Sequence, residues 1–271
     1  MNECSASPTA PESAARAVEA LLAEHGGRLY RIGLRICGDP ADAEDLVQET
    51  FLNAYKSWDG FRGDASPSTW LYTIAMNACR RQKRLRAGQP SQLQSLDLPD
   101  IASEDFVPEL PSSAPDPYDE SVRRETRELV EDAISALPFD FRMPLVLKEI
   151  ADLSVAQISS IIDLKPATVK TRLHRARLLL RQALTERVPR RPVEKSGEAV
   201  CLDLIQAKQE ALDRGVEFTF PPELLTERCA SLFATLDLSR QVCLEIRRGA
   251  LPDDVRRRIL DVVEKRGAGE A

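Results

Sequence analysis

Positively charged side chains gather on one expected helix in the middle of the chain. From Leu164 to Leu184 no acidic residue occurs, while lysine and arginine recur throughout. Apolar residues in the same stretch follow helical spacing and form one buried stripe: Val169, Leu173, Ala176, Leu180 and Leu184. A helix with an apolar inner stripe and an outer face of a single charge is suited to the phosphates and base edges of nucleic acid.

A shorter expected helix, residues 155–162, precedes the basic one. Ser154 is a plausible N-cap for it, and Pro166 suits the first turn of the helix that follows the break. Two short helices joined by a tight turn, with a basic second helix, are typical of a helix-turn-helix, whose second helix enters the major groove. An ordinary helical hairpin with a solvated charged face is the alternative. The single sign of the charge favours nucleic acid.

Length and composition limit the class of protein. The 271 residues suggest two or more domains, and helical periods without an alternating strand pattern predict an all-α fold. No apolar run reaches the roughly 18 residues that span a bilayer, and the N-terminus lacks signal-peptide order, so we expect a cytoplasmic protein without membrane insertion. The six cysteines stand singly, without CxxC spacing. We therefore expect buried thiols, no metal site and no cofactor.

The net charge of −6 conceals a segregation of charge along the chain. Residues 87–120 hold eight acids, six prolines and no base, which predicts a flexible acidic linker. Basic residues concentrate on both sides of it, in the helix described above and at the end of an earlier one, where residues 80–86 contain five bases. Two cationic segments on a tether indicate two nucleic-acid contacts.

The earlier basic segment combines aromatic and cationic side chains. A loop rich in turn formers, residues 59–68, separates Trp58 from the helix that begins near Trp70. Aromatic rings can stack on unpaired bases while cations hold the backbone, so this segment suits single-stranded DNA. Burial in the core explains Trp70 equally well. The preceding helix, 41–58, has an acidic outer face that charge alone assigns to solvent.

These patterns divide the chain into six segments. We expect a disordered N-terminus, two small helical domains, the flexible linker between them, a hinge, and a helical C-terminal extension for which a regulatory role is open. The N-terminus is 1–12, the first helical domain 13–86 and the linker 87–120. The second helical domain is 121–187, the hinge 188–199 and the C-terminal extension 200–271.

Two strings together resemble a known family. DAEDLVQETFLNAYKSWDGFRGDASPSTWLYTIAMNACRR and ALPFDFRMPLVLKEIADLSVAQISSIIDLKPATVKTRLHRARLLL are similar to the two conserved domains of extracytoplasmic-function (ECF) sigma factors, the promoter-recognition subunits of bacterial RNA polymerase. The resemblance covers residues 28–86 and 121–187. Asp163 and Ala167 stand where relatives usually have glycine; aspartate tolerates a left-handed turn. Residues 192–271 exceed a minimal member, and such extensions often regulate.

The resemblance implies partners and site residues. Core RNA polymerase would bind the acidic helix through Asp45, Gln48, Glu49 and Asn53. Melted DNA of the −10 element would contact Phe61, Arg62, Trp70, Asn77, Arg80, Arg81 and Arg84. Duplex DNA of the −35 element would contact Thr168, Lys170, Thr171, Arg172, His174, Arg175 and Arg177, with Arg172 or Arg177 nearer the phosphates. The acidic linker would follow the RNA exit path, and a separate anti-sigma factor is left open.

Two alternatives to a sigma factor remain. A free-standing helix-turn-helix regulator would bind duplex DNA without polymerase, but it gives no role to residues 61–86. An enzyme lacks support, because the chain has no phosphate-binding loop, HExxH motif or nucleophile elbow, and its only histidines are His25 and His174. We therefore predict that the chain is not an enzyme.

Overall fold

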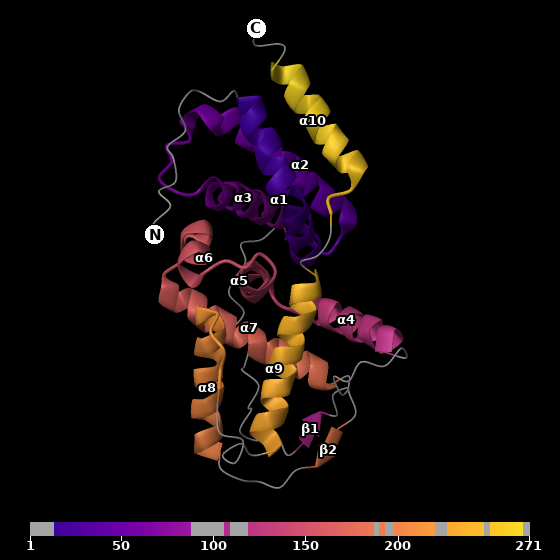
Figure 1. Ribbon diagram of the computed structural model, residues 1–271, viewed down its shortest axis with the longest axis vertical. Coiled ribbons are helices and arrows are strands. Elements are labelled where there is room, and N and C mark those ends of the chain that lie inside the picture. The colour runs from indigo at the N-terminus through magenta and orange to yellow at the C-terminus, as the bar shows by residue number, and fades with distance from the viewer. Residues whose placement is uncertain are drawn as a thin grey trace. The chain divides into compact units, whose positions relative to one another are not determined.

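The computed structural model describes residues 14–87, 106–108, 119–186, 190–192, 198–219, 227–246 and 250–267, and helices dominate these ranges (Figure 1). The all-α prediction is confirmed. The chain divides into two compact units, residues 1–89 with 249–271 and residues 90–248. The expected disordered N-terminus, most of the linker and most of the hinge lie outside the described residues.

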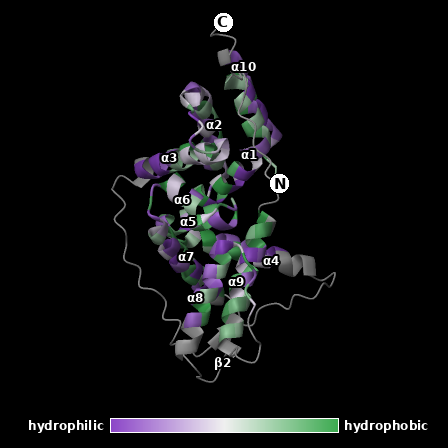
Figure 2. Ribbon diagram, turned by 60° about the vertical axis from the view of Figure 1, so that its left-hand side comes forward, coloured by the Kyte–Doolittle hydropathy of each residue, from purple (hydrophilic) through white to green (hydrophobic). Residues whose placement is uncertain are grey.

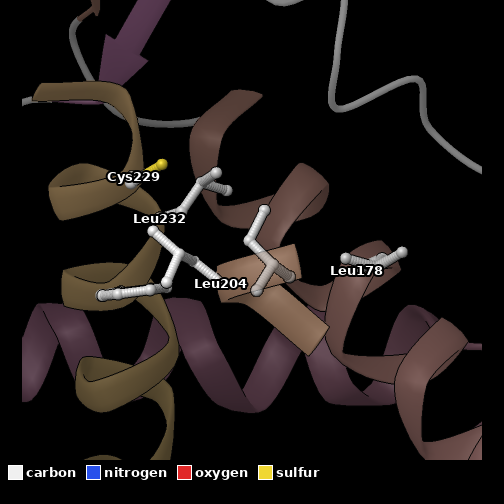
Figure 3. Packing of buried hydrophobic residues seen from close by; sticks show 6 residues of the cluster. Leu178, Leu204, Cys229 and Leu232 are labelled. Atoms are coloured by element: carbon white, nitrogen blue, oxygen red, sulfur yellow. The ribbon is translucent and has the colours of Figure 1, made fainter. Parts of the chain in front are cut away.

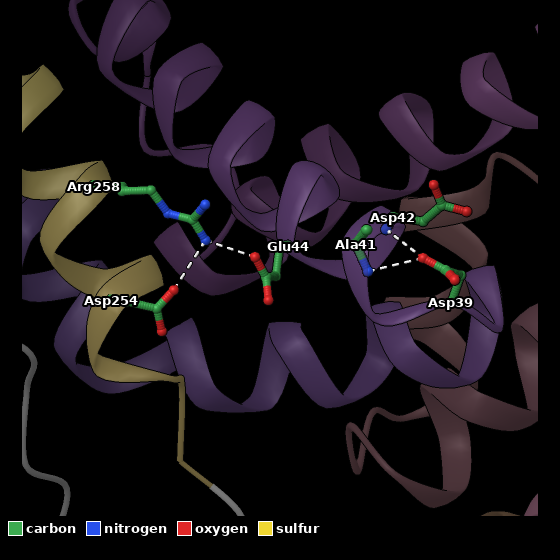
Figure 4. A network of polar contacts seen from close by, with 6 residues as sticks. All are labelled: Asp39, Ala41, Asp42, Glu44, Asp254 and Arg258. Atoms are coloured by element: carbon green, nitrogen blue, oxygen red, sulfur yellow. Dashed lines mark hydrogen bonds and ion pairs between the residues drawn. The ribbon is translucent and has the colours of Figure 1, made fainter.

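The first unit is built on α1, α2 and α3, with a 3-10 turn, η1, between the last two. Their bounds are Ala14–Cys37, Pro40–Ser57, Pro67–Ala87 and, for η1, Trp58–Gly60. The Asp39 carboxylate accepts hydrogen bonds from the N–H groups of Ala41 (2.8 Å) and Asp42 (3.2 Å), so it caps α2 (Figure 4). A Cβ on Gly33 would lie 3.1 Å from that of Ala43. Glycine thus lets α1 approach α2 closely.

A helix from the end of the chain completes the first unit. The α10 helix, Asp253–Gly267, packs against α1 and α2. Its ribbon in Figure 2 carries both hydrophilic and hydrophobic residues, and the hydrophobic ones are buried: Val255, Ile259 and Val263, after Leu251 in the preceding turn. A Cβ on Gly26 would lie 3.2 Å from Leu251 Cδ2. The close packing of this segment explains a glycine in the middle of α1.

The second unit contains the helix-turn-helix. Helices α4 and α5 precede it, and α6 and α7 form it; their bounds are Asp119–Ala136, Phe139–Glu149, Val155–Ile162 and Pro166–Glu186. Ser154 and Gln157 form a reciprocal capping box at the start of α6. Asp163 ends α6 in the left-handed conformation (φ 53°), as predicted for a turn without glycine. The capping box and the left-handed turn each depend on residues close together in the sequence.

The expected C-terminal extension is divided between the two units, because α10 belongs to the first unit, whereas α8 and α9 belong to the second. The bounds of α8 and α9 are Glu198–Arg214 and Glu227–Ile246. Helix α9 is continuous over its full length. Ser239 Oγ donates to the carbonyl of Thr235 (2.8 Å), so the helix continues through this buried polar pair.

Two further findings differ from expectation. Residues Phe106–Pro108 of the linker (β1) pair antiparallel with Arg190–Pro192 of the hinge (β2), a strand pair that the composition did not predict. Cys229 is disulfide-bonded rather than the thiol expected, while Cys37, Cys79 and Cys243 form no disulfide. Within the described ranges, no helix is long and apolar enough to cross a membrane.

Candidate nucleic-acid interfaces

The beginning of α7 presents a polar surface to solvent. Its inner stripe is buried against α5 and α6, and Val169 and Leu173 are both 0% exposed. Thr168, Lys170 and Thr171 are exposed on the opposite side. The capped α6 and the left-handed turn fix where α7 begins. This part of the predicted −35 surface is therefore exposed to solvent, while the inner side of α7 packs on α5 and α6.

Arg172, His174 and Arg175 are only partly exposed. A nitrogen of Arg172 lies 3.6 Å from an oxygen of Asp140 on α5, so this guanidinium is shared with a carboxylate of its own unit. Burial lowers the pKa of His174. The resemblance placed His174 against the −35 duplex, whereas the structure shields part of its side chain from solvent.

Arg177 is buried, which the sequence did not lead us to expect. The sequence placed it near DNA phosphates, but its side chain is 4% exposed and lies between two carboxylates, Glu149 of α5 and Asp213 of α8. Its guanidinium nitrogens lie 2.9 Å and 2.8 Å from the respective oxygens. The two carboxylates raise the pKa of Arg177 despite its burial. The enclosed side chain binds two acids of its own unit.

Three aromatic rings form a cluster beside the loop of the first unit. Trp58 stacks on Phe61 with centroids 5.4 Å apart, and Phe61 lies 5.1 Å from Trp70. All three are partly exposed. Burial in the core, which was the alternative for Trp70, is therefore incomplete. Tyr72, in contrast, is 1% exposed and belongs to the core.

The polar residues predicted for the −10 element lie on α3 and in the preceding loop. Arg62, Asn77 and Arg84 are exposed, and Arg80 is partly exposed with an interaction partner. Arg81 forms a salt bridge with Glu49 of α2. That bridge connects the predicted −10 surface with the predicted polymerase surface, which the sequence had treated as separate.

The acidic face of α2 is accessible. Asp45 is exposed, and Gln48, Glu49 and Asn53 are partly exposed, with the Asn53 amide 3.5 Å from Glu49. This face borders α10. Figure 4 shows Arg258 donating to Glu44 (2.6 Å), at the edge of the same surface, and to Asp254 (3.3 Å).

Sequence reasoning missed Leu178, Glu149 and Asp213. Leu178 carried a signal, since it falls on the outer, basic face of α7, where an apolar residue indicates that another element covers it. Glu149 and Asp213 carried none, because each pairs with a residue at least 28 positions away. Among the described residues, no group of His, Cys, Asp or Glu could hold a metal ion.

Comparison with known proteins matches both units. Residues 21–88 match the family model "Sigma-70 region 2", and residues 127–180 match "Sigma-70, region 4". The chain is 34% identical over 138 residues to the ECF RNA polymerase sigma-E factor of Escherichia coli K12. The aligned region covers 50% of this chain and 70% of that protein. It is 32% identical over 159 residues to the ECF RNA polymerase sigma factor SigW of Bacillus subtilis, spanning 59% and 84%.

A solved structure, that of CnrH in complex with the cytosolic domain of CnrY, is similar with a TM-score of 0.46 and 24% identity, covering 64% of this chain and 94% of that one. Residues 181–271 lie outside both family matches.

Proposed function

Because the chain belongs to the ECF sigma factors of RNA polymerase, we propose that it binds core polymerase, recognises the −35 and −10 elements of promoters and initiates their transcription. In this role it catalyses nothing itself and works in the cytoplasm beside the polymerase. The observation that carries the proposal is the exposed polar beginning of α7 on a capped helix-turn-helix, in one chain with an aromatic and basic surface on the other unit.

The −35 duplex meets α7 through Thr168, Lys170 and Thr171, with Arg175 at the edge of the same surface. A recognition helix contacts base edges through its first turns, where these residues lie. Lysine and arginine add the phosphate attraction on which DNA affinity depends.

The melted −10 strand meets the first unit at the cluster of Trp58, Phe61 and Trp70. Partly exposed rings offer faces to unpaired bases, and the neighbouring polar side chains Arg62, Asn77, Arg80 and Arg84 hold the strand. Arg81 is bound to Glu49, so we assign it to positioning α3 against α2.

Replacing Asp45 with lysine is expected to weaken binding of core polymerase about tenfold, equivalent to roughly 1.4 kcal/mol, because a like charge then faces the basic surface that we propose for the partner. The measurement is the amount of core polymerase that co-purifies with the tagged full chain. Glu19→Lys, which reverses an exposed charge on α1, is the matched control. Tight duplex binding without any co-purification of polymerase would instead identify a free-standing regulator.

Replacing Arg175 with alanine is expected to reduce selection of the −35 element by about 1–3 kcal/mol, as for loss of a base-edge contact. Start sites mapped after overexpression define the promoter, and competition between promoter and random duplex then measures selection. Arg124→Ala, at an exposed position on α4, controls for loss of one positive charge. An equal loss on both duplexes would assign Arg175 to the phosphates.

A further inference from the structure

Helix α8 is bound to the recognition helix by a buried ion pair. Asp213 of α8 lies 2.8 Å from Arg177 of α7, with side chains 10% and 4% exposed. The backbone carbonyl of Asp213 also accepts a hydrogen bond from Lys148 of α5 (2.9 Å). Two elements of the helix-turn-helix domain thus hold the C-terminal end of α8.

An apolar contact extends the same attachment. Leu178 of α7 is 4% exposed and packs with Leu204 and Ile205 of α8 and with Leu232 and Phe233 of α9 (Figure 3). Leu178 follows Thr171 by seven positions, so both lie on one face of α7. This face points away from the inner stripe. The segment after residue 197 therefore covers the continuation of the surface that we assign to duplex DNA.

On α7, the surface around Leu178 that α8 and α9 cover lies close to the exposed surface around Thr171. Duplex DNA therefore cannot occupy the exposed surface while α8 and α9 stay in place. At 1.5 Å per residue, Leu178 is about 10 Å along the helix from Thr171. A major groove is about 12 Å wide and bordered by two phosphate backbones. A duplex seated on Thr171 would therefore place a backbone where α8 and α9 lie.

We infer that α8 competes with duplex DNA for the outer face of α7, so that the chain covers its own −35 surface until α8 is released. This inference rests on the proposed function of α7. The inner stripe of α7 packs on α5 and α6, so the helix-turn-helix keeps its core when α8 leaves. Arg177 also keeps Glu149 as a partner.

The size of the effect follows from the population of the open form. The apparent dissociation constant is the intrinsic one divided by the fraction of molecules in which α7 is free. If about one molecule in ten is open, releasing α8 tightens duplex binding about tenfold. No residue of α7 has to change for this gain.

The test compares Asp213→Asn with Asp203→Asn in the full chain. Both substitutions remove one negative charge from α8, but Asp203 is exposed, whereas Asp213 contacts Arg177. Binding of a labelled 30-base-pair duplex of random sequence is measured at low salt, and hydrogen exchange of the α8 amides is measured in parallel. Leu204→Ala attacks the same attachment through its apolar contact, with Leu244→Ala, at a 40% exposed position of α9, as its control.

We expect Asp213→Asn and Leu204→Ala to speed exchange in α8 and to tighten duplex binding about tenfold, beyond any change in the two controls. Faster exchange with unchanged binding would overturn the inference, and so would no change in either measurement.

Adding Lys170→Ala to the wild type and to Asp213→Asn distinguishes failure of the inference on α8 from failure of the proposed function of α7. If Lys170→Ala weakens binding in both backgrounds but Asp213→Asn brings no gain, the inference alone fails. If Lys170→Ala has no effect in either background, α7 does not bind duplex DNA, and the proposed function of α7 fails with it.

Discussion

Replacing Arg177 with alanine is expected to lower the free energy of unfolding of the second unit by about 3–5 kcal/mol. The substitution leaves Glu149 and Asp213, whose side chains are 12% and 10% exposed, as neighbouring carboxylates without the guanidinium that neutralises them. Urea denaturation followed by circular dichroism measures the loss. Both tryptophans, Trp58 and Trp70, lie in the first unit, so fluorescence should show that unit unchanged.

Lys170→Ala is the matched control for the Arg177 substitution, because it removes a positive charge from an exposed position of the same helix. Its cost to stability should stay within about 0.5 kcal/mol. One result would support the phosphate contact first expected for Arg177. If Arg177→Ala weakened DNA binding while the unfolding free energy stayed constant, Arg177 would be a phosphate contact.

Replacing Phe51 with alanine is expected to lower the unfolding free energy of the first unit by about 3–5 kcal/mol. Phe51 is 0% exposed between the helices of that unit, and the smaller side chain leaves a cavity. Tryptophan fluorescence follows this transition directly, and the chain should lose both polymerase binding and −10 contacts as the unit unfolds.

Leu52→Ala is the neighbouring control, since Leu52 is partly exposed and its truncation opens no enclosed cavity. The unfolding transition of the second unit should keep its midpoint in both variants. If Phe51→Ala moved the transitions of both units together, the two units would unfold as one cooperative body and not independently.

The sequence alone determined the local structure of this protein. The Asp39 cap, the Ser154–Gln157 capping box and the left-handed Asp163 all follow from groups within a few residues of one another. The inner stripe of α7 follows from helical periodicity in the same way. Such signals need no knowledge of distant segments, because the atoms involved are brought together by the helix itself. The family resemblance rested on these same segments, and the comparisons confirmed it.

Only the tertiary structure decided which basic side chains of α7 remain available. Arg177 and Lys170 are both positively charged and belong to one helix, yet the first is buried and the second exposed. The difference arises from Asp213, a carboxylate 36 positions along the chain from Arg177, which α8 brings into contact. In the same way, only the structure shows that α10 packs against α1 and α2, where a side chain at Gly26 of α1 would meet Leu251. Charge and periodicity describe what a helix can bind, whereas the choice among distant partners is made by packing.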